Sequence, residues 1–305
     1  MKLIHFMNQF PDEESCELFI KSYRNKSGIY CKKCEKVTHH YWFSGAKFFE
    51  CRQCRRRSSL KSGTVMENSK LPLQVWMLAF MFISATKKGF SCLEFKRQLG
   101  LSRYETAFRL MHKIRAAMGR RDSLYLLKDM VEYDEGYIEV ATKKLVKNQL
   151  KRGKGSQRQA QVAVAAESTP LEDSESGKKT RVCGYFKMEV IDKVDSEHVN
   201  CFIRQNTDGD VILFTDKNTA YANLEKVVNT HFTVTAGKEE TNDTLRWVHK
   251  AISNLKRNLL GTYHMVTFKY LQNYLNEFVY KLNRRYFGEK LFERLIIASI
   301  HPYVH

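Results

Sequence analysis

Four of the eight cysteines occur as two close pairs, Cys31-Lys-Lys-Cys34 and Cys51-Arg-Gln-Cys54, separated by sixteen residues. Two C-x2-C pairs at this spacing are typical of zinc ribbons, in which each pair forms a knuckle and four thiolates bind one tetrahedral Zn²⁺. Four thiolates leave no open coordination position, so the pattern predicts a structural zinc. The neighbouring His39 and His40 are expected at the surface, outside the ligand set.

The other cysteines have no partner at ligand spacing and are expected to be small buried residues. They are Cys16, Cys92, Cys183 and Cys201. The N-terminal residues do not follow the signal-peptide pattern, so we expect a cytoplasmic protein without a disulfide framework.

A second set of reactive side chains is acidic and begins in Val131–Val140, whose pattern predicts a strand. Side chains alternate along a strand, which places Glu132 and Asp134 on one face and Tyr133 and Glu135 on the other. A carboxylate in an apolar strand is costly to bury unless it is paired or binds a metal. The segment alone fits either a half-exposed edge strand or a metal-binding strand.

Asp216 ends the apolar run Val211–Asp216, which predicts a buried strand. In the strand order inferred below, the strands of Asp134 and Asp216 are neighbours, so the two carboxylates can share a metal pair. Oxygen ligands of this kind suit Mg²⁺ or Mn²⁺. Two such ions about 3.5–4 Å apart can activate an attacking water or 3′-hydroxyl and stabilise the leaving 3′-oxygen of an in-line phosphoryl transfer.

A third metal ligand is expected on the helix predicted over Trp247–Lys256, where His249 and Lys256 are seven residues apart and share a face. A neutral imidazole suits Mn²⁺ better than Mg²⁺, and it is lost as pH falls through about 6.5. A histidine among apolar residues can also be a packed core residue. The other candidate ligands are Asn254, Glu240 and Asp243.

The elements that must position these residues begin with helices. Leu71–Ala85 predicts a buried helix with Pro72 in its first turn. Ser91 is expected to cap a short helix over Cys92–Gln98, and Ser102 to cap a longer one after the turn at Leu99–Leu101. Helix, glycine-containing turn and helix form a helix-turn-helix pattern. The polar side of the second helix is expected to carry Arg103, Arg109, His112, Lys113 and Arg115.

Strands follow the helices. The pattern predicts five strands, short helices near Ser196–Ile203 and over Tyr221–Val228, and a helical region from about Asp243 onward. A solvent-exposed loop is expected over Ser168–Lys179, between the second and third strands. The predicted strands are Val131–Val140, Gln159–Glu167, Thr180–Ile191, Val211–Asp216 and His231–Thr235. This order is that of a ribonuclease H-like fold with a mixed five-stranded sheet. We therefore predict a multidomain α+β protein. Its parts are an N-terminal segment and zinc ribbon (1–60), a helical helix-turn-helix-like region (61–122), and a ribonuclease H-like domain with C-terminal helices (123–305).

The net charge of +18 implies a polyanionic partner. The longest apolar run, Leu71–Ala85, is too short to span a bilayer, so we expect DNA and no membrane partner. Basic side chains supply sequence-independent affinity for phosphates. The candidate phosphate contacts are Arg55, Arg56, Arg57, Arg103, Arg109 and Lys113, together with Lys151, Arg152 and Lys154 of the basic segment Lys147–Arg158.

In combination, these segments resemble the DDE-type insertion-sequence transposases, in the bacterial group related to the eukaryotic Merlin elements. The resemblance covers nearly the whole chain. It is carried by the four ribbon cysteines, Lys70–Leu73, Asp134–Ile138, Lys151–Ser156, Thr215-Asp216 with Tyr221, Trp247–Arg257, Leu260–His264, Tyr274–Phe278 and Asn283–Arg285.

The resemblance implies that Asp134 and Asp216 bind the catalytic metals, that His249 takes the third position, and that Lys256 holds DNA phosphate. It also implies binding of terminal inverted repeats, metal-dependent strand cleavage and strand transfer into target DNA. Because two ends must meet, a homo-oligomer on double-stranded DNA is expected. One alternative is a catalytically inactive or domesticated DNA-binding protein, and another is a structure-selective nuclease of the same fold.

Overall fold

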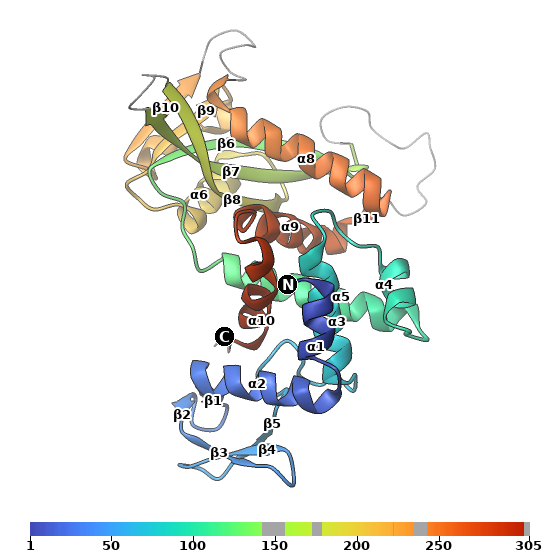
Figure 1. The fold of residues 1–305 in the computed structure, drawn as a ribbon. Helices are drawn as coiled ribbons and strands as arrows, with labels where there is room; N and C mark the ends of the chain where they lie inside the picture. The colour runs from blue at the N-terminus through green and yellow to red at the C-terminus, as the bar shows by residue number, and fades with distance from the viewer. Residues whose placement is uncertain (142–155, 173–178, 222, 235–242, 302–305) are drawn as a thin grey trace. The chain divides into compact units, whose positions relative to one another are not determined.

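The computed structural model describes residues 1–141, 156–172, 179–221, 223–234 and 243–301 (Figure 1). The chain forms two compact units, Met1–Arg121 together with Arg284–His305, and Asp122–Asn283. The predicted phosphate contacts Lys151, Arg152 and Lys154 lie outside the described residues. Among the helices of the described ranges, none has the length and apolar character needed to cross a membrane.

The first unit opens with two helices and a small all-β module. The helices are α1 (Leu3–Gln9) and α2 (Glu13–Ser27). The module pairs β1 (Ile29–Cys31) with β2 (Lys36–Thr38), and β4 (Phe48–Cys51) with both β3 (His40–Phe43) and β5 (Arg57–Ser59). Arg24 of α2 is buried and donates to the backbone oxygens of Ser59 and Leu60 at 3.2 and 2.6 Å. These bonds tie the end of β5 to α2.

The remaining helices of this unit are α3 (Leu73–Ala85), α4 (Cys92–Gln98), α5 (Tyr104–Asp122) and α10 (Leu291–Ile300). The Ser91 hydroxyl accepts from the Glu94 backbone as an N-cap, and Gly100 takes a positive φ of 62° in the following turn. Both features follow the sequence prediction, whereas α5 begins one residue later than a cap at Ser102 implies.

The C-terminal helix α10 belongs to the first unit, although the sequence prediction placed it with the sheet domain in residues 123–305. The Phe292 ring contacts Phe6 and Phe10, with centroids 5.8 and 6.0 Å apart. The Val65 backbone also donates to Ser299 at 2.9 Å. Burial of these side chains therefore draws residues distant in sequence into one core.

The second unit is built on a mixed sheet. Its strands are β6 (Met130–Ala141), β7 (Gln159–Glu172), β8 (Lys179–Ile191), β9 (Ile212–Asp216), β10 (Thr230–Val234) and β11 (Val266–Thr267). The order is β10-β9-β6-β7-β8, with β9 parallel to both β6 and β10, and β7 antiparallel to both neighbours. Numbered in chain order from β6 and read from the β8 edge, this is 3-2-1-4-5, the ribonuclease H-like order. The predicted fold class is confirmed.

Helices cover both faces of this sheet (Figure 1). On one face, α8 (Arg246–Tyr263) and α9 (Phe268–Asn283) bury a core with the even-numbered residues of β6 and β7. On the other face, α6 (Ser196–Asn206) packs on the odd-numbered residues, including Val131 and Tyr133. The alternation along β6 is therefore as the sequence predicts.

Three local predictions were wrong. The sheet has a sixth strand, because β11 pairs with the end of β6 at Val140 and Ala141. Tyr221–Val228 was predicted as a helix, but its described residues form only parts of the short 3-10 turns Thr219–Tyr221 and Leu224–Lys226. Strands β7 and β8 continue into the predicted loop Ser168–Lys179 after an irregularity between Ala166 and Ser168. Pro170 is tolerated there because pairing with β6 has already ended at Glu167.

Candidate functional site

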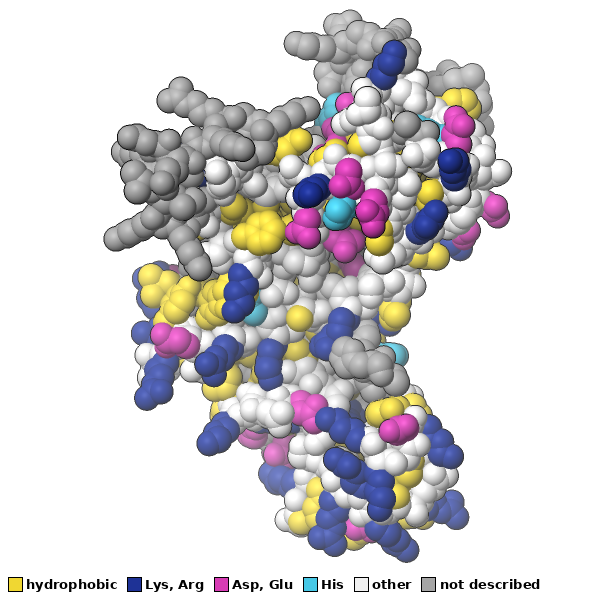
Figure 2. Space-filling model, turned by 180° about the vertical axis from the view of Figure 1, so that it is seen from behind, with side chains coloured by type: hydrophobic (Ala, Val, Ile, Leu, Met, Phe, Trp, Pro, Cys, Tyr) yellow, Lys and Arg dark blue, Asp and Glu magenta, His cyan; other side chains and the backbone are white. Residues whose placement is uncertain are grey.

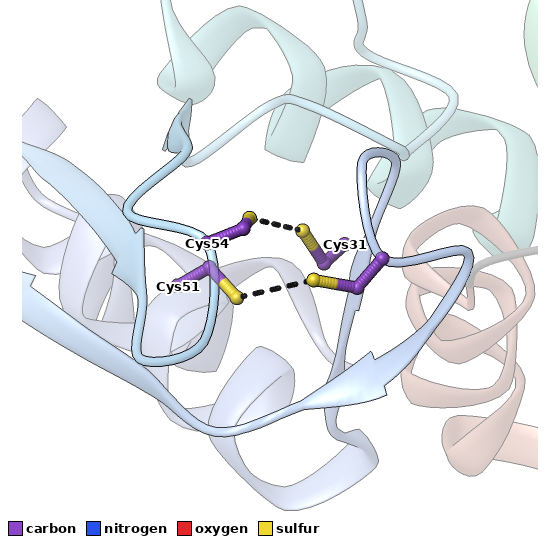
Figure 3. A group of neighbouring side chains, drawn as sticks. Cys31, Cys51 and Cys54 are labelled. Atoms are coloured by element: carbon purple, nitrogen blue, oxygen red, sulfur yellow. Dashed lines mark hydrogen bonds between the residues drawn. The ribbon is translucent and has the colours of Figure 1, made fainter.

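The two cysteine pairs form matching knuckles. In each, a backbone N–H bonds back to the first cysteine: Glu35 donates to Cys31 at 2.8 Å and Arg55 to Cys51 at 3.0 Å. Glu35 and Arg55 also share a positive φ, 52° and 59°. The facing sulfurs lie 3.4 Å apart for Cys31 and Cys54, and 3.9 Å apart for Cys34 and Cys51 (Figure 3).

This arrangement fits zinc. A Zn–S bond of about 2.3 Å in a tetrahedron places sulfurs about 3.8 Å apart, and all four sulfurs lie within 4.8 Å of one another. Burial raises the pKa of Cys51, but the Thr38 hydroxyl and the backbone N–H groups of Cys54 and Gln53 outweigh it and lower that pKa to about 5. A thiolate, the form that zinc binds, is thus favoured at Cys51, whereas the hydrogen bond with Cys54 raises the pKa of Cys34. His39 is exposed and the His40 ring faces the Thr38 carbonyl at 2.9 Å, so neither joins the cysteines.

The free cysteines outside the cluster behave as predicted in three of four cases. Cys16, Cys92 and Cys183 are buried, whereas Cys201 is exposed on α6. The prediction of burial was wrong for Cys201, because it lies on the solvent side of a helix whose buried side carries Val199, Phe202 and Ile203.

In the second unit, β6 and α8 bring Asp134 and His249 together. Asp134 Oδ2 lies 3.1 Å from His249 Nε2, and the two side chains are 20% and 33% exposed. The other carboxylate oxygen accepts from the Glu135 backbone at 2.8 Å. The hydrogen bond that the protonated imidazole donates to Asp134 raises the pKa of His249, with burial acting against it. The pair is thus fixed in place yet open to solvent.

Asp216 comes to the same end of the sheet. Strands β6 and β9 run parallel and their pairing ends at Glu132 and Phe214. Asp134 lies two residues beyond Glu132 within β6, and Asp216 lies two residues beyond Phe214 at the end of β9. The charge of Asp216 acts on both His249 and Glu135. Three potential ligands from β6, β9 and α8 therefore gather where two neighbouring strands separate.

The donor set suits divalent cations, since carboxylates and an imidazole are ligands of Mg²⁺ and Mn²⁺. Within the described ranges, only the four cysteines bring three or more ligand atoms within 4.8 Å of one another. The ligand atoms of Asp134, Asp216 and His249 therefore do not all lie within 4.8 Å of one another. In addition, protonated His249 places a positive charge beside Asp134, where a metal cation would otherwise lie.

Glu132 lies two residues before Asp134 and has no exposed surface. Its Oε2 accepts from the backbone N–H groups of Trp247 and Val248 at 2.7 and 3.1 Å. Burial raises the pKa of Glu132, while the Ser168 hydroxyl, the two N–H groups and the Arg181 charge oppose that rise. This carboxylate is thus occupied by the start of α8.

Glu135 faces the opposite side of the sheet. The Tyr221 hydroxyl donates to its two oxygens at 2.8 and 2.7 Å. Burial raises the pKa of Glu135 to about 7, and the Asp134 and Asp216 charges add to the effect of burial. Glu135 therefore shares the field of the acidic site without sharing its face.

The remaining predicted site residues lie on the helices. Lys256 is exposed on α8, two turns beyond His249. Asn254, the alternative third ligand, is exposed and accepts from Arg257 at 2.7 Å. Asp243 is exposed before α8, and Glu240 lies outside the described residues. His249 is the candidate that the fold places beside Asp134.

Of the predicted phosphate contacts, Arg55, Arg56, Arg57, Arg103 and Arg109 are exposed. Lys113 is half-buried: its ammonium donates to the Glu67 backbone at 2.7 Å, and burial lowers its pKa. His112 and Arg115 are buried as well, because α5 packs on more of its surface than a solvent-facing helix would. Lys and Arg side chains are nevertheless dense over the β-module and the helices around it (Figure 2).

Two residues of the site region were not identified from the sequence. Arg181 of β8 donates to the Thr244 backbone just before α8 at 3.0 Å. Gly136 shares the face of Asp134, and a Cβ there would lie 3.3 Å from Ile252 of α8. The glycine could have been found, since a glycine inside a strand signals a close approach of another element. No local pattern marks Arg181.

Residues 126–283 match the family model of the ISXO2-like transposase domain, which is more than half of the chain and nearly the whole second unit. The protein belongs to this family. A relative from Halobacterium salinarum, named "Uncharacterized protein in transposable element ISH50", is 25% identical over 166 residues. That alignment covers 53% of this chain and 54% of the relative, so the chain spans about half the length of the curated relative that it matches.

Among solved structures, the chain matches the Mos1 transposase paired-end complex with left transposon end. The sequence identity is 11%, and the match covers 75% of this chain and 80% of that chain. The TM-score is 0.21, too low to indicate a shared fold. The ribonuclease H-like assignment therefore stands on the strand order of the second unit.

Proposed function

We propose that this protein is the transposase of an insertion sequence, which cleaves DNA at the element ends and joins the freed 3′-hydroxyls to target DNA. The observation that carries the proposal is the contact of Asp134 with His249, whose Oδ2 and Nε2 atoms lie 3.1 Å apart, with Asp216 two residues beyond the last β6–β9 pair. The family membership and the relative in a transposable element support the same activity.

In this proposal Asp134, Asp216 and His249 hold two Mg²⁺ or Mn²⁺ ions. When bound, such ions activate the attacking oxygen and stabilise the leaving oxygen at phosphorus. The chain's own residues orient the reaction: the Glu135 backbone N–H holds the Asp134 carboxylate at 2.8 Å, and Lys256 binds a phosphate of the DNA near the scissile bond. No covalent enzyme intermediate is required, because each step is a direct displacement at phosphorus.

The first unit is proposed to bind the terminal inverted repeats. Its zinc ribbon presents the exposed Arg55, Arg56 and Arg57, and Arg103 and Arg109 add charge on the helical region. Arg55 and Arg57 lie 3.4 and 3.1 Å from Glu50, so an exposed cation cluster is held on one acidic anchor. Such side chains give phosphate affinity that falls with salt. Homo-oligomerisation would bring two ends together.

The test is nicking and strand transfer on a duplex that carries the inverted repeats flanking the coding sequence, with Mg²⁺ or Mn²⁺. We expect Asp134→Asn, Asp216→Asn and His249→Ala to lose cleavage, and Asn254→Ala, on the same helix, to retain it. Activity in His249→Ala together with its loss in Asn254→Ala would make Asn254 the third ligand.

Two other outcomes separate the competing functions. End-specific binding without cleavage under either metal would overturn the proposal in favour of a DNA-binding protein derived from a transposase. Cleavage that ignores the end sequence would instead indicate a structure-selective nuclease. A duplex with scrambled ends is the matched control for both.

A further inference from the structure

The start of α8 lacks a cap of its own. Its N-cap residue Leu245 makes no side-chain bond, and the first turn contains no acidic residue. The N–H groups of Trp247 and Val248, at the second and third helical positions, are the donors that an N-cap side chain ordinarily satisfies. Here they bond to Glu132 Oε2 at 2.7 and 3.1 Å. The cap is therefore supplied by strand β6, more than a hundred residues earlier in the chain.

Arg181 of β8 completes this attachment. Its Nη1 donates to the Thr244 carbonyl at 3.0 Å and lies 3.8 Å from Glu132 Oε1. The Glu132 side chain has no exposed surface, and that of Arg181 is 27% exposed. Two strands of the sheet thus hold both the free N–H groups and a carbonyl at the start of the helix.

The same face of β6 fixes the rest of the helix. Asp134 meets His249, one residue beyond Val248, at 3.1 Å. Gly136 then lies beneath Ile252, where a Cβ would be only 3.3 Å from its Cγ atoms. Successive even-numbered residues of one strand therefore contact successive positions along α8, which sets both its register and its distance from the sheet.

We propose that Glu132, supported by Arg181, is a positioning residue of the active site: by capping α8 it holds His249 in place as the third metal ligand. This inference rests on the proposed function, since it requires His249 to be a ligand. It assigns Glu132 no contact with metal or DNA. A purely structural Glu132 would stabilise the second unit without a specific effect on His249.

The test compares Glu132→Gln, which keeps the side-chain length and an acceptor oxygen, with Glu132→Ala, which removes the cap. Mn²⁺ alone is the probe, and its binding to the full chain is titrated. We expect Glu132→Ala to weaken Mn²⁺ binding about tenfold or more and Glu132→Gln to weaken it less. In nicking, kcat should fall while KM for the end duplex stays unchanged. Glu139→Ala, an exposed acid on the same strand, is the matched control.

A double-mutant cycle separates positioning from general stability. If Glu132 acts through His249, Glu132→Ala should weaken Mn²⁺ binding no further in a His249→Ala background. Fully additive losses would overturn the positioning role and leave the proposed function intact. If Glu132→Ala does not fold, Glu132→Gln carries the same cycle.

Hydrogen exchange gives a readout that does not depend on metal. The amides of Trp247 and Val248 should exchange faster in Glu132→Ala, and to a smaller extent in Glu132→Gln. Unchanged exchange in Glu132→Ala would overturn the cap. If His249→Ala alone leaves Mn²⁺ binding and nicking unchanged, the assignment of His249 fails and the positioning role fails with it, which differs visibly from the additive result.

Discussion

The two candidate metal centres of this chain are built in opposite ways. The zinc ligands lie within Cys31–Cys54, and all four sulfurs lie within 4.8 Å of one another. The ligands of the acidic site come from β6, β9 and α8, more than a hundred residues apart at the extremes, and Asp134 and His249 are 20% and 33% exposed. The first site is closed and complete, whereas the second is open and contains the contact between Asp134 and His249.

In the proposed function, this difference separates a metal that holds a fold from metals that do chemistry. Four thiolates fill a tetrahedron and leave no position for a substrate. Two carboxylates and one imidazole leave coordination positions for water and phosphate oxygens. The ribbon should therefore depend on its metal for folding, while the second unit should fold first and bind its metals afterwards.

Loss of zinc should produce the largest effect. Structural zinc in small modules contributes on the order of 10 kcal/mol of apparent binding free energy, so Cys54→Ser should leave residues 29–59 unfolded. Metal analysis should show one zinc in the parent protein and less than that in the variant. Proteolysis should cut the ribbon while β6–β8 stay protected. Cys201→Ser is the control, and a zinc-free protein with a protected ribbon would contradict this view.

Asp134→Asn should have the converse effect. Cleavage should fall by about a thousandfold, since metal stabilisation of the transition state is worth several kcal/mol. Zinc content and affinity for the end duplex should remain at the parent level, because both belong to the first unit. Cys54→Ser should reduce affinity instead. If Asp134→Asn loses zinc or end binding, the two sites are not independent.

The contrast also explains which features could be predicted from sequence. The cysteine spacing encodes the zinc site locally, so the ligands follow without knowledge of the fold. Asp134 and Asp216 required one further step, since strand order places the ends of β6 and β9 together. The alternation of Glu132, Asp134 and Gly136 also follows from the period of a strand.

Tertiary packing decided the rest. Lys113 has the composition of a phosphate contact, yet its ammonium is bonded to the Glu67 carbonyl. Arg115 has no exposed surface. The cap from Glu132 to Trp247 joins residues 115 positions apart, and neither segment contains a signal for the other. Local sequence patterns therefore do not predict which polar groups are buried by contacts between distant segments.

The acidic site should respond to pH through His249. The hydrogen bond with Asp134 raises the pKa of His249 above its ordinary 6.5. In the metal-free protein, stability from this pair is fully present below pH 6.5 and is lost as pH rises through the raised pKa. Metal binding requires the neutral imidazole, so Mn²⁺ affinity should rise about tenfold per pH unit over that interval. Titrations from pH 5.5 to 8.5 test this, with His249→Ala expected to flatten the slope.

The smallest effect should come from Glu135, which shares the field of the acidic site from the opposite face. Burial raises its pKa from 4.5 to about 7. A carboxyl group with a raised pKa binds its proton more tightly in the folded state than in the unfolded state. Glu135 therefore lowers the stability of the second unit as pH rises from about 4.5 to 7. Glu135→Gln should therefore stabilise the second unit by about 2 kcal/mol at pH 8 and have little effect at pH 4.5.

Hydrogen exchange of the β6–β7 amides, without added divalent metal, measures this difference, and exposed Glu139→Gln is the control. An equal gain in stability at both pH values would mean that the change in packing against Tyr221, and not the loss of the Glu135 charge, stabilises the variant. If bound metal cancels the gain at pH 8, the field of Asp134 and Asp216 is what the ions neutralise. That result would distinguish the acidic site from the ribbon, whose four cysteines are expected to bind one ion as the module folds.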